Sequence, residues 1–74
     1  MATWIVTVKK GGHVNGLKLE AGMSVEVSVN SSSNPIMYGG GMDAIAEAFS
    51  DKYGLDSRKV RSINMQYQFE ARKL

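Results

Sequence analysis

The chain has 74 residues, no cysteine and a formal net charge of +2. So short a chain forms a small core and buries about 60–65% of the surface that it exposes when unfolded. The absence of cysteine excludes disulfide bonds, thiolate metal sites and cysteine nucleophiles. No apolar run approaches the roughly 18 residues that a membrane span needs, and the first residues lack the pattern of a signal peptide. We therefore expect a single domain over residues 1–74, located in the cytoplasm and without a membrane partner.

Alternating apolar and polar residues predict strands in the first part of the chain. Residues 3–9 and residues 23–29 both alternate, which is typical of an antiparallel sheet covered on one side. Between them, Asn15-Gly16 suits a tight type I′ turn, because both residue types tolerate a positive φ. A second turn is expected at residues 20–22. We predict three N-terminal strands joined by two tight hairpins.

Residues 42–53 predict the single substantial helix. Its apolar residues recur at a helical period and form one stripe, which consists of Met42, Ile45, Ala46, Phe49 and Tyr53. Gly54 is well placed to end the helix. In the polar loop before it, residues 36–38 are apolar and are expected to return to the core.

Residues 63–71 alternate strictly and predict a final strand beside the first, either antiparallel or parallel. The expected fold is α+β, with a small, mostly antiparallel sheet in the order β-β-β-α-β and the helix packed on one face. The predicted core shares this inward-facing pattern and comprises Trp4, Val6, Val8, Leu19, Met23, Val25, Val27, Ile45, Phe49, Tyr53, Ile63, Met65, Tyr67 and Phe69.

Short motifs spread over most of the chain carry a family resemblance: Val14-Asn15-Gly16, Leu19-Glu20, residues 22–27, Asn34-Pro35, glycines 39–41, and Phe49 with residues 52–56. By these motifs the chain resembles a family of small uncharacterised bacterial proteins, chiefly from gut bacteria. The resemblance implies a complete, free-standing protein in a bacterial cytoplasm. It implies no catalytic residue, because that family has no assigned activity.

The residues that bear reactive groups do not assemble a catalytic pattern. His13 is the single histidine, and its surroundings in sequence predict an exposed strand-edge residue rather than a base or metal ligand. Glycines 39–41 lack the Lys-Ser/Thr of a phosphate-binding loop and are expected to let the helix dock closely. Asp43, Glu47 and Asp51 share one helix face, which we expect to be solvated. We predict no enzyme activity, no metal and no cofactor.

Basic residues form three groups in the sequence, which are Lys9 and Lys10; Arg58, Lys59 and Arg61; and Arg72 and Lys73. If the first and last strands are neighbours, some of these residues gather beside the uncovered sheet face, where nucleic acid can bind. However, the outward positions include Glu26 and Glu70 and no aromatic residue to stack on bases. The preferred prediction is a non-enzymatic protein-interaction or accessory module, and the alternative is a weak nucleic-acid-binding protein.

Trp4 and Ile5 are adjacent in the first strand and therefore point to opposite faces of the sheet. The helix covers only one of these faces. The other face leaves an apolar side chain exposed or is covered by a partner. We predict that this partner is a second copy, bound through a strand edge or the open face, or another protein.

Overall fold

The computed structural model describes residues 2–14, 16–30 and 32–74. Within these residues, a three-stranded antiparallel sheet in the order β4-β1-β5 is built from β1 (Ala2–Val8), β4 (Ser24–Val29) and β5 (Phe69–Lys73). A separate two-stranded antiparallel ribbon is built from β2 (Gly12–Val14) and β3 (Leu17–Leu19). The α+β fold class is confirmed, and the last strand lies beside the first in antiparallel orientation.

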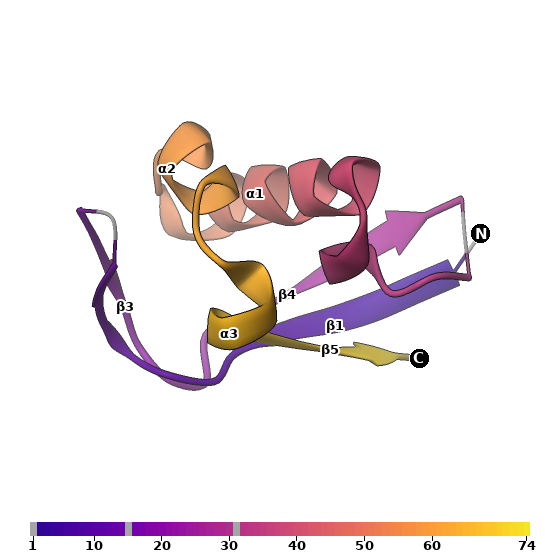
Figure 1. The fold of residues 1–74 in the computed structure, drawn as a ribbon, viewed down its shortest axis with the longest axis horizontal. Coiled ribbons are helices and arrows are strands. Elements are labelled where there is room, and N and C mark those ends of the chain that lie inside the picture. Colours follow the sequence, from indigo (N-terminus) through magenta and orange to yellow (C-terminus); the bar gives the residue numbers. More distant parts are fainter. Residues whose placement is uncertain (1, 15, 31) are drawn as a thin grey trace.

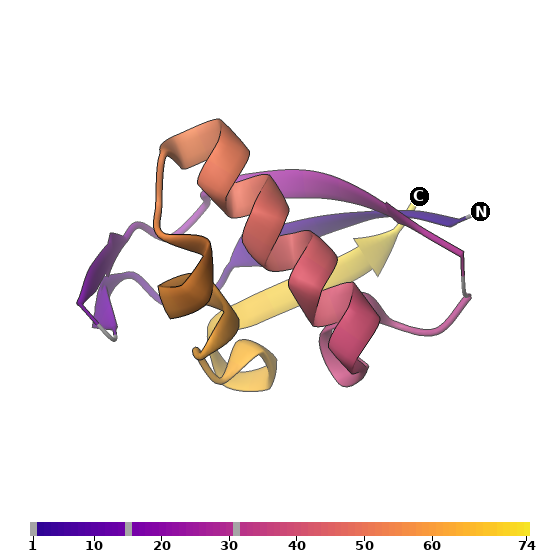
Figure 2. The same cartoon turned by 90° about the horizontal axis from the view of Figure 1, so that it is seen from above.

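The helical segments lie over or beside one face of the three-stranded sheet, and the last of them lies at the outer edge of the sheet where β5 begins, as Figures 1 and 2 show. They are η1 (Pro35–Met37), α1 (Gly39–Tyr53), α2 (Ser57–Arg61) and α3 (Met65–Gln68). The long helix α1 runs across the sheet, and α2 packs against it. The described residues therefore form two layers, with one face of the sheet covered and the other open.

Helix α1 begins at Gly39, three residues before the predicted start. A Cβ added at Gly41 would lie 2.3 Å from Pro35 O, so only glycine lets α1 approach η1 this closely. The packing role predicted for glycines 39–41 is therefore seen at Gly41. At the other end, Gly54 adopts a left-handed φ of 71°, and its N–H donates to Ser50 O (2.9 Å), which ends the helix as predicted.

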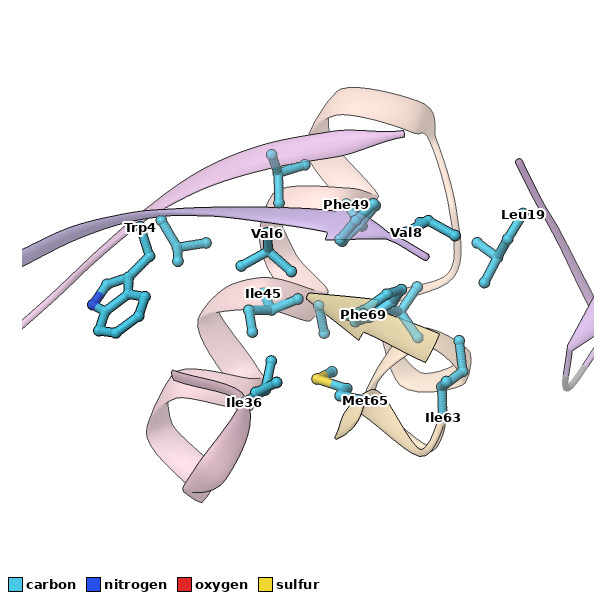
Figure 3. Packing of buried hydrophobic residues seen from close by; sticks show 14 of the residues in the cluster. Trp4, Val6, Val8, Leu19, Ile36, Ile45, Phe49, Ile63, Met65 and Phe69 are labelled. Atoms are coloured by element: carbon cyan, nitrogen blue, oxygen red, sulfur yellow. The ribbon is translucent and has the colours of Figure 1, made fainter. Parts of the chain in front are cut away.

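The core lies between α1 and the covered sheet face (Figure 3). Phe49 is fully buried and stacks on Phe69 with ring centroids 5.0 Å apart. Val6 and Val8 of β1 are also buried beneath the helix. Most of the predicted core is confirmed, while Met23 and Tyr53 are only half-buried against it. Buried apolar residues outside that list are Leu17, Val29 and Val60, together with Ala46 of the predicted helix stripe and Ile36, which was expected to return to the core.

The predicted strand over residues 63–71 is wrong in its first half. Residues 65–68 form the helical turn α3, and β5 begins only at Phe69. The Asn64 side chain accepts from Tyr67 N (3.4 Å) and caps this turn, while Ile63 and Met65 are still buried. Tyr67 points outward with 54% of its surface exposed, so its assignment to the core is also wrong.

In the described residues, the N-terminal region contains four strands rather than three, because the predicted Asn15-Gly16 hairpin forms its own ribbon instead of joining the main sheet. The pairing of Val14 with Leu17 leaves two residues between the strands, as expected for a tight hairpin. Gly16 has a φ of 80°, which suits the turn, and Asn15 lies outside the described residues.

Candidate interaction surface

The uncovered face of the sheet is mainly polar. It carries the side chains that alternate with the core residues, namely Thr3, Ile5, Thr7, Ser24, Glu26, Ser28, Glu70 and Arg72. Ile5 is half-buried here, because it lies between Glu26 on one neighbouring strand and Arg72 on the other. Trp4, by contrast, is buried on the helix side. The longer charged neighbours shield the apolar side chain of Ile5, so the flat face itself offers little apolar surface.

The hydrogen bonds of the central strand show which backbone groups remain at the two sheet edges. Val8 N donates to Met23 O (2.8 Å), which lies on the β4 side. Leu74 N donates to Thr3 O (2.9 Å), which joins β1 to the β5 side. Since antiparallel bonds alternate along a strand, even-numbered residues of β1 bond toward β4 and odd-numbered residues bond toward β5.

The same alternation fixes the outward peptide groups of each edge strand. At the β5 edge, these groups belong to Phe69, Ala71 and Lys73. At the β4 edge, they belong to Ser24, Glu26 and Ser28. Unpaired strand edges of this kind accept further strands unless something covers them.

One end of the β4 edge is covered. The Tyr53 hydroxyl accepts from Ser24 N (3.0 Å) and lies 3.2 Å from Ser24 O. Lys52 Nζ also donates to Ser24 O (2.7 Å). Both peptide groups of Ser24 are therefore occupied by side chains from the end of α1, and a new strand cannot bond to them without displacing these contacts.

The rest of the β4 edge borders an acidic groove. The predicted solvated face of α1 is exposed and carries Asp43, Glu47 and Asp51. These carboxylates line a shallow groove together with Glu26 of β4. Asp43 Oδ1 pairs with Arg61 Nε at 2.7 Å. An ion pair this exposed contributes little, about 0–1 kcal/mol.

The β5 edge differs from the β4 edge in its neighbours, because large apolar side chains are exposed just before β5, just after it and on η1. Among the described residues, the large apolar side chains with high exposure are Met37 (61%), Tyr67 (54%) and Leu74 (64%). Met37 belongs to η1, which packs against both β5 and α3. Tyr67 precedes β5 and Leu74 follows it. We call Met37, Tyr67 and residues 69–74 the β5 edge surface.

Tyr67 is also joined to the end of the first strand. Lys10 Nζ donates to Tyr67 Oη (2.8 Å) and lies 4.3 Å from the centre of its ring. The hydrogen bond from Lys10, together with its positive charge, lowers the pKa of the exposed Tyr67 hydroxyl. Lys10 thereby holds the aromatic ring beside the start of β5.

The predicted basic residues occupy three separate places. Lys9 and Lys10 follow β1 and contact α3, where Lys9 Nζ donates to Gln66 O (3.3 Å). Another group lies on α2, on the helix side of the sheet, and a third lies on β5. Lys73 pairs with Trp4 in the register, about 16 Å along the strand from Lys9. The fold does not merge the three groups, which are the same as in the sequence: Lys9 and Lys10; Arg58, Lys59 and Arg61; and Arg72 and Lys73.

The described residues form neither a metal site nor a membrane-spanning helix. No group of three or more His, Asp or Glu side chains in residues 2–14, 16–30 and 32–74 is arranged to hold a metal ion. His13 is exposed on β2, as predicted. In the same described part of the chain, no helix is long and apolar enough to cross a membrane.

Sequence reasoning missed Met37 and Leu74 as surface features. Met37 was expected to return to the core with its neighbours, but only Ile36 is buried and Met37 faces outward. The signal in the sequence was slight, since Met37 stands between Ile36 and Tyr38 in a run expected in the core, and Leu74 is a single apolar residue after Arg72 and Lys73. An exposed apolar residue is ordinary when isolated, and it gains meaning only when the fold brings several together.

Comparison with known proteins adds a family but no activity. The sequence model of a family of unknown function (DUF6140) matches residues 1–70. No curated protein and no solved structure matches the chain.

Proposed function

Because the chain belongs to this family of unknown function, we propose from its own structure that it is a non-catalytic protein-interaction module, which binds a partner protein along the β5 edge surface. The cytoplasm is its proposed compartment.

The observation that carries this proposal is that β5 is an edge strand among the described residues, with exposed Tyr67 just before it, exposed Leu74 just after it, and exposed Met37 on the neighbouring η1. An edge strand supplies backbone donors and acceptors to an incoming strand, and neighbouring apolar side chains supply area that is removed from water. Both components occur together at β5. At β4, the Ser24 end is covered and carboxylates line the remaining edge.

The alternative, weak nucleic-acid binding through the basic residues, draws less support. Their three groups lie beside α3, on α2 and along β5, and Arg61 is paired with Asp43. On the open sheet face, Arg72 is accompanied by Glu26 and Glu70. A polyanion bound across this face would meet both signs of charge, which weakens the electrostatic attraction that nonspecific binding depends on.

Photo-crosslinking from single positions tests the proposal. A photoreactive phenylalanine analogue replaces Met37 or Leu74 in the β5 edge surface, and a matched control carries it at Glu47, an exposed residue of α1. Each variant is irradiated in an extract of its source cells. We expect covalent adducts with another polypeptide chain, of either the same or a different sequence, from Met37 and Leu74 but not from Glu47. Equal adduct yields at all three positions, or no adducts at Met37 and Leu74, would contradict the proposal.

A further inference from the structure

We infer that the strand seated on the β5 edge is β5 of a second copy of this chain, running antiparallel about a two-fold axis at Ala71. The inference rests on the proposed function and names its partner. It joins two three-stranded sheets into one continuous sheet, with the helices of both copies on the same side.

The outward peptide groups of β5 allow this pairing. Phe69, Ala71 and Lys73 direct their backbone groups away from β1, so these residues must face one another in a strand pair. With the axis at Ala71, the Ala71 N–H of each copy donates to Ala71 O of the other. Lys73 N–H donates to Phe69 O of the second copy. Phe69 N already donates to Met65 O at the end of α3 and needs no new acceptor.

The charges on the open face select this register. Pairing about Ala71 places Glu70 opposite Arg72 of the second copy, twice by symmetry. Because these two residues form a pair without backbone bonds between them, their Cα atoms approach to about 4.5 Å, and the side chains meet closely. A slip of two residues in the partner strand, in either direction, places Glu70 opposite Glu70 or Arg72 opposite Arg72. Like charges directly opposite are destabilising, and a slip of one residue breaks the alternation of backbone bonds.

The same register brings together the exposed apolar residues that flank β5. Beyond Lys73 the partner strand meets Gln68, the last residue of α3, so regular strand pairing ends there. Leu74 of one copy then lies near the turn that carries Tyr67 of the other, and both residues are exposed in the single chain.

The β4 edge is unsuited to the same partner. A second copy paired through β4 would bring two acidic grooves together, each lined by Glu26 and the exposed carboxylates of α1. It would also have to displace Tyr53 and Lys52 from Ser24. Charge complementarity therefore favours β5 with β5 and opposes β4 with β4.

Charge reversal in β5 tests the inference in solution. Sedimentation equilibrium of the whole chain should give twice the monomer mass of 8.1 kDa as concentration rises. Glu70→Arg alone and Arg72→Glu alone each create two like-charged pairs and should weaken the dimer about tenfold or more, as expected if both pairs change sign. Glu20→Arg, at an exposed position between β3 and β4, makes the same change of charge away from β5 and should leave the dimer unchanged.

Mixing the two single variants provides the sharper outcome. An edge with two arginines faces an edge with two glutamates, so Glu70→Arg mixed with Arg72→Glu should form a heterodimer while each alone is mainly monomeric. The double variant Glu70→Arg/Arg72→Glu should dimerise again by itself. Amide exchange gives an independent readout, since the Ala71 and Lys73 N–H groups should become protected as the dimer forms.

A monomer at every concentration would overturn the inference, as would a dimer that responds equally to Glu20→Arg and to the β5 reversals. These results differ from failure of the proposed function. If the chain is monomeric but Met37 and Leu74 still crosslink to a different polypeptide, the protein-binding role stands and the second copy is the wrong partner. If neither self-association nor crosslinking occurs, both fail.

Discussion

Replacement of Phe49 by alanine removes the side chain at the centre of the core. Phe49 has no exposed surface, and its ring stacks between Phe69 (5.0 Å between centroids) and Tyr53 (5.8 Å). Truncating a buried phenylalanine to alanine costs about 3–5 kcal/mol through lost burial and the cavity left behind. A chain of 74 residues has a total stability of about 4–11 kcal/mol. Phe49→Ala therefore removes between about a quarter and all of the free energy of unfolding.

Urea unfolding, followed by the fluorescence of the single tryptophan, measures this loss at one fixed protein concentration. A second variant, Phe49→Leu, is included because Phe49→Ala can leave too little folded protein to show a transition. Phe49→Leu removes less of the side chain and should cost about 1.5 kcal/mol. Tyr67→Ala is the control, since Tyr67 is 54% exposed and its loss should stay below about 1 kcal/mol. If Phe49→Ala keeps the wild-type midpoint, or if Tyr67→Ala proves the more damaging of the two, α1 does not close the core as the structure indicates.

Further predictions concern packing, titration and charge. Gly41→Ala should lose about 1–3 kcal/mol in the same unfolding assay, because its Cβ would overlap Pro35. Gly40→Ala should not, since its Cβ meets only the Tyr38 ring at 3.5 Å. In an alkaline absorbance titration, Lys10→Met should raise the pKa of Tyr67, and Tyr67→Phe should remove that transition from the wild-type curve. The sign follows from the lowered pKa: ionised Tyr67 adds stability above the unfolded-state pKa, and this contribution is lost as the pH falls through the folded-state pKa. In a mobility-shift assay at low salt, single-stranded and duplex DNA should migrate unchanged, and retardation that disappears at high salt would instead support the nucleic-acid alternative.

The elements that were predicted well are those with one buried side. Residues of β1 and β4 alternate because every second side chain packs beneath α1, and Ile45, Ala46 and Phe49 recur at the helical period for the same reason. Burial imposes these periods directly on the sequence. The position of β5 beside β1 was also predicted, although only the structure showed that the two strands are antiparallel.

The segment before β5 was mispredicted because its alternation is compatible with two structures. Ile63, Met65 and Phe69 are all buried, and both a strand and a bend through one helical turn can bury them. Tertiary context decides between these, since the chain must descend from the helix layer to the edge of the sheet. Asn64 caps the turn that makes this descent, and a short capping motif is easily hidden in an alternating pattern.

The candidate surface could not be read from periodicity. Met37 and Leu74 lie far apart in sequence and meet the same strand edge only after folding. The opposite charges of Glu70 and Arg72 are visible in the sequence. They suggest self-pairing only when β5 is known to be an edge strand whose Ala71 backbone groups point away from β1.

The cover over Ser24 has a consequence for how far an assembly of this chain can grow. A subunit with two receptive edges is bivalent and polymerises into an endless ribbon, which is the route to cross-β fibres. Tyr53 and Lys52 occupy the peptide groups of Ser24, and carboxylates repel a like edge along the remainder of β4. If the chain pairs through β5 as we infer, the cover on Ser24 and the carboxylates beside the rest of β4 oppose a second pairing, so the assembly ends at a closed pair.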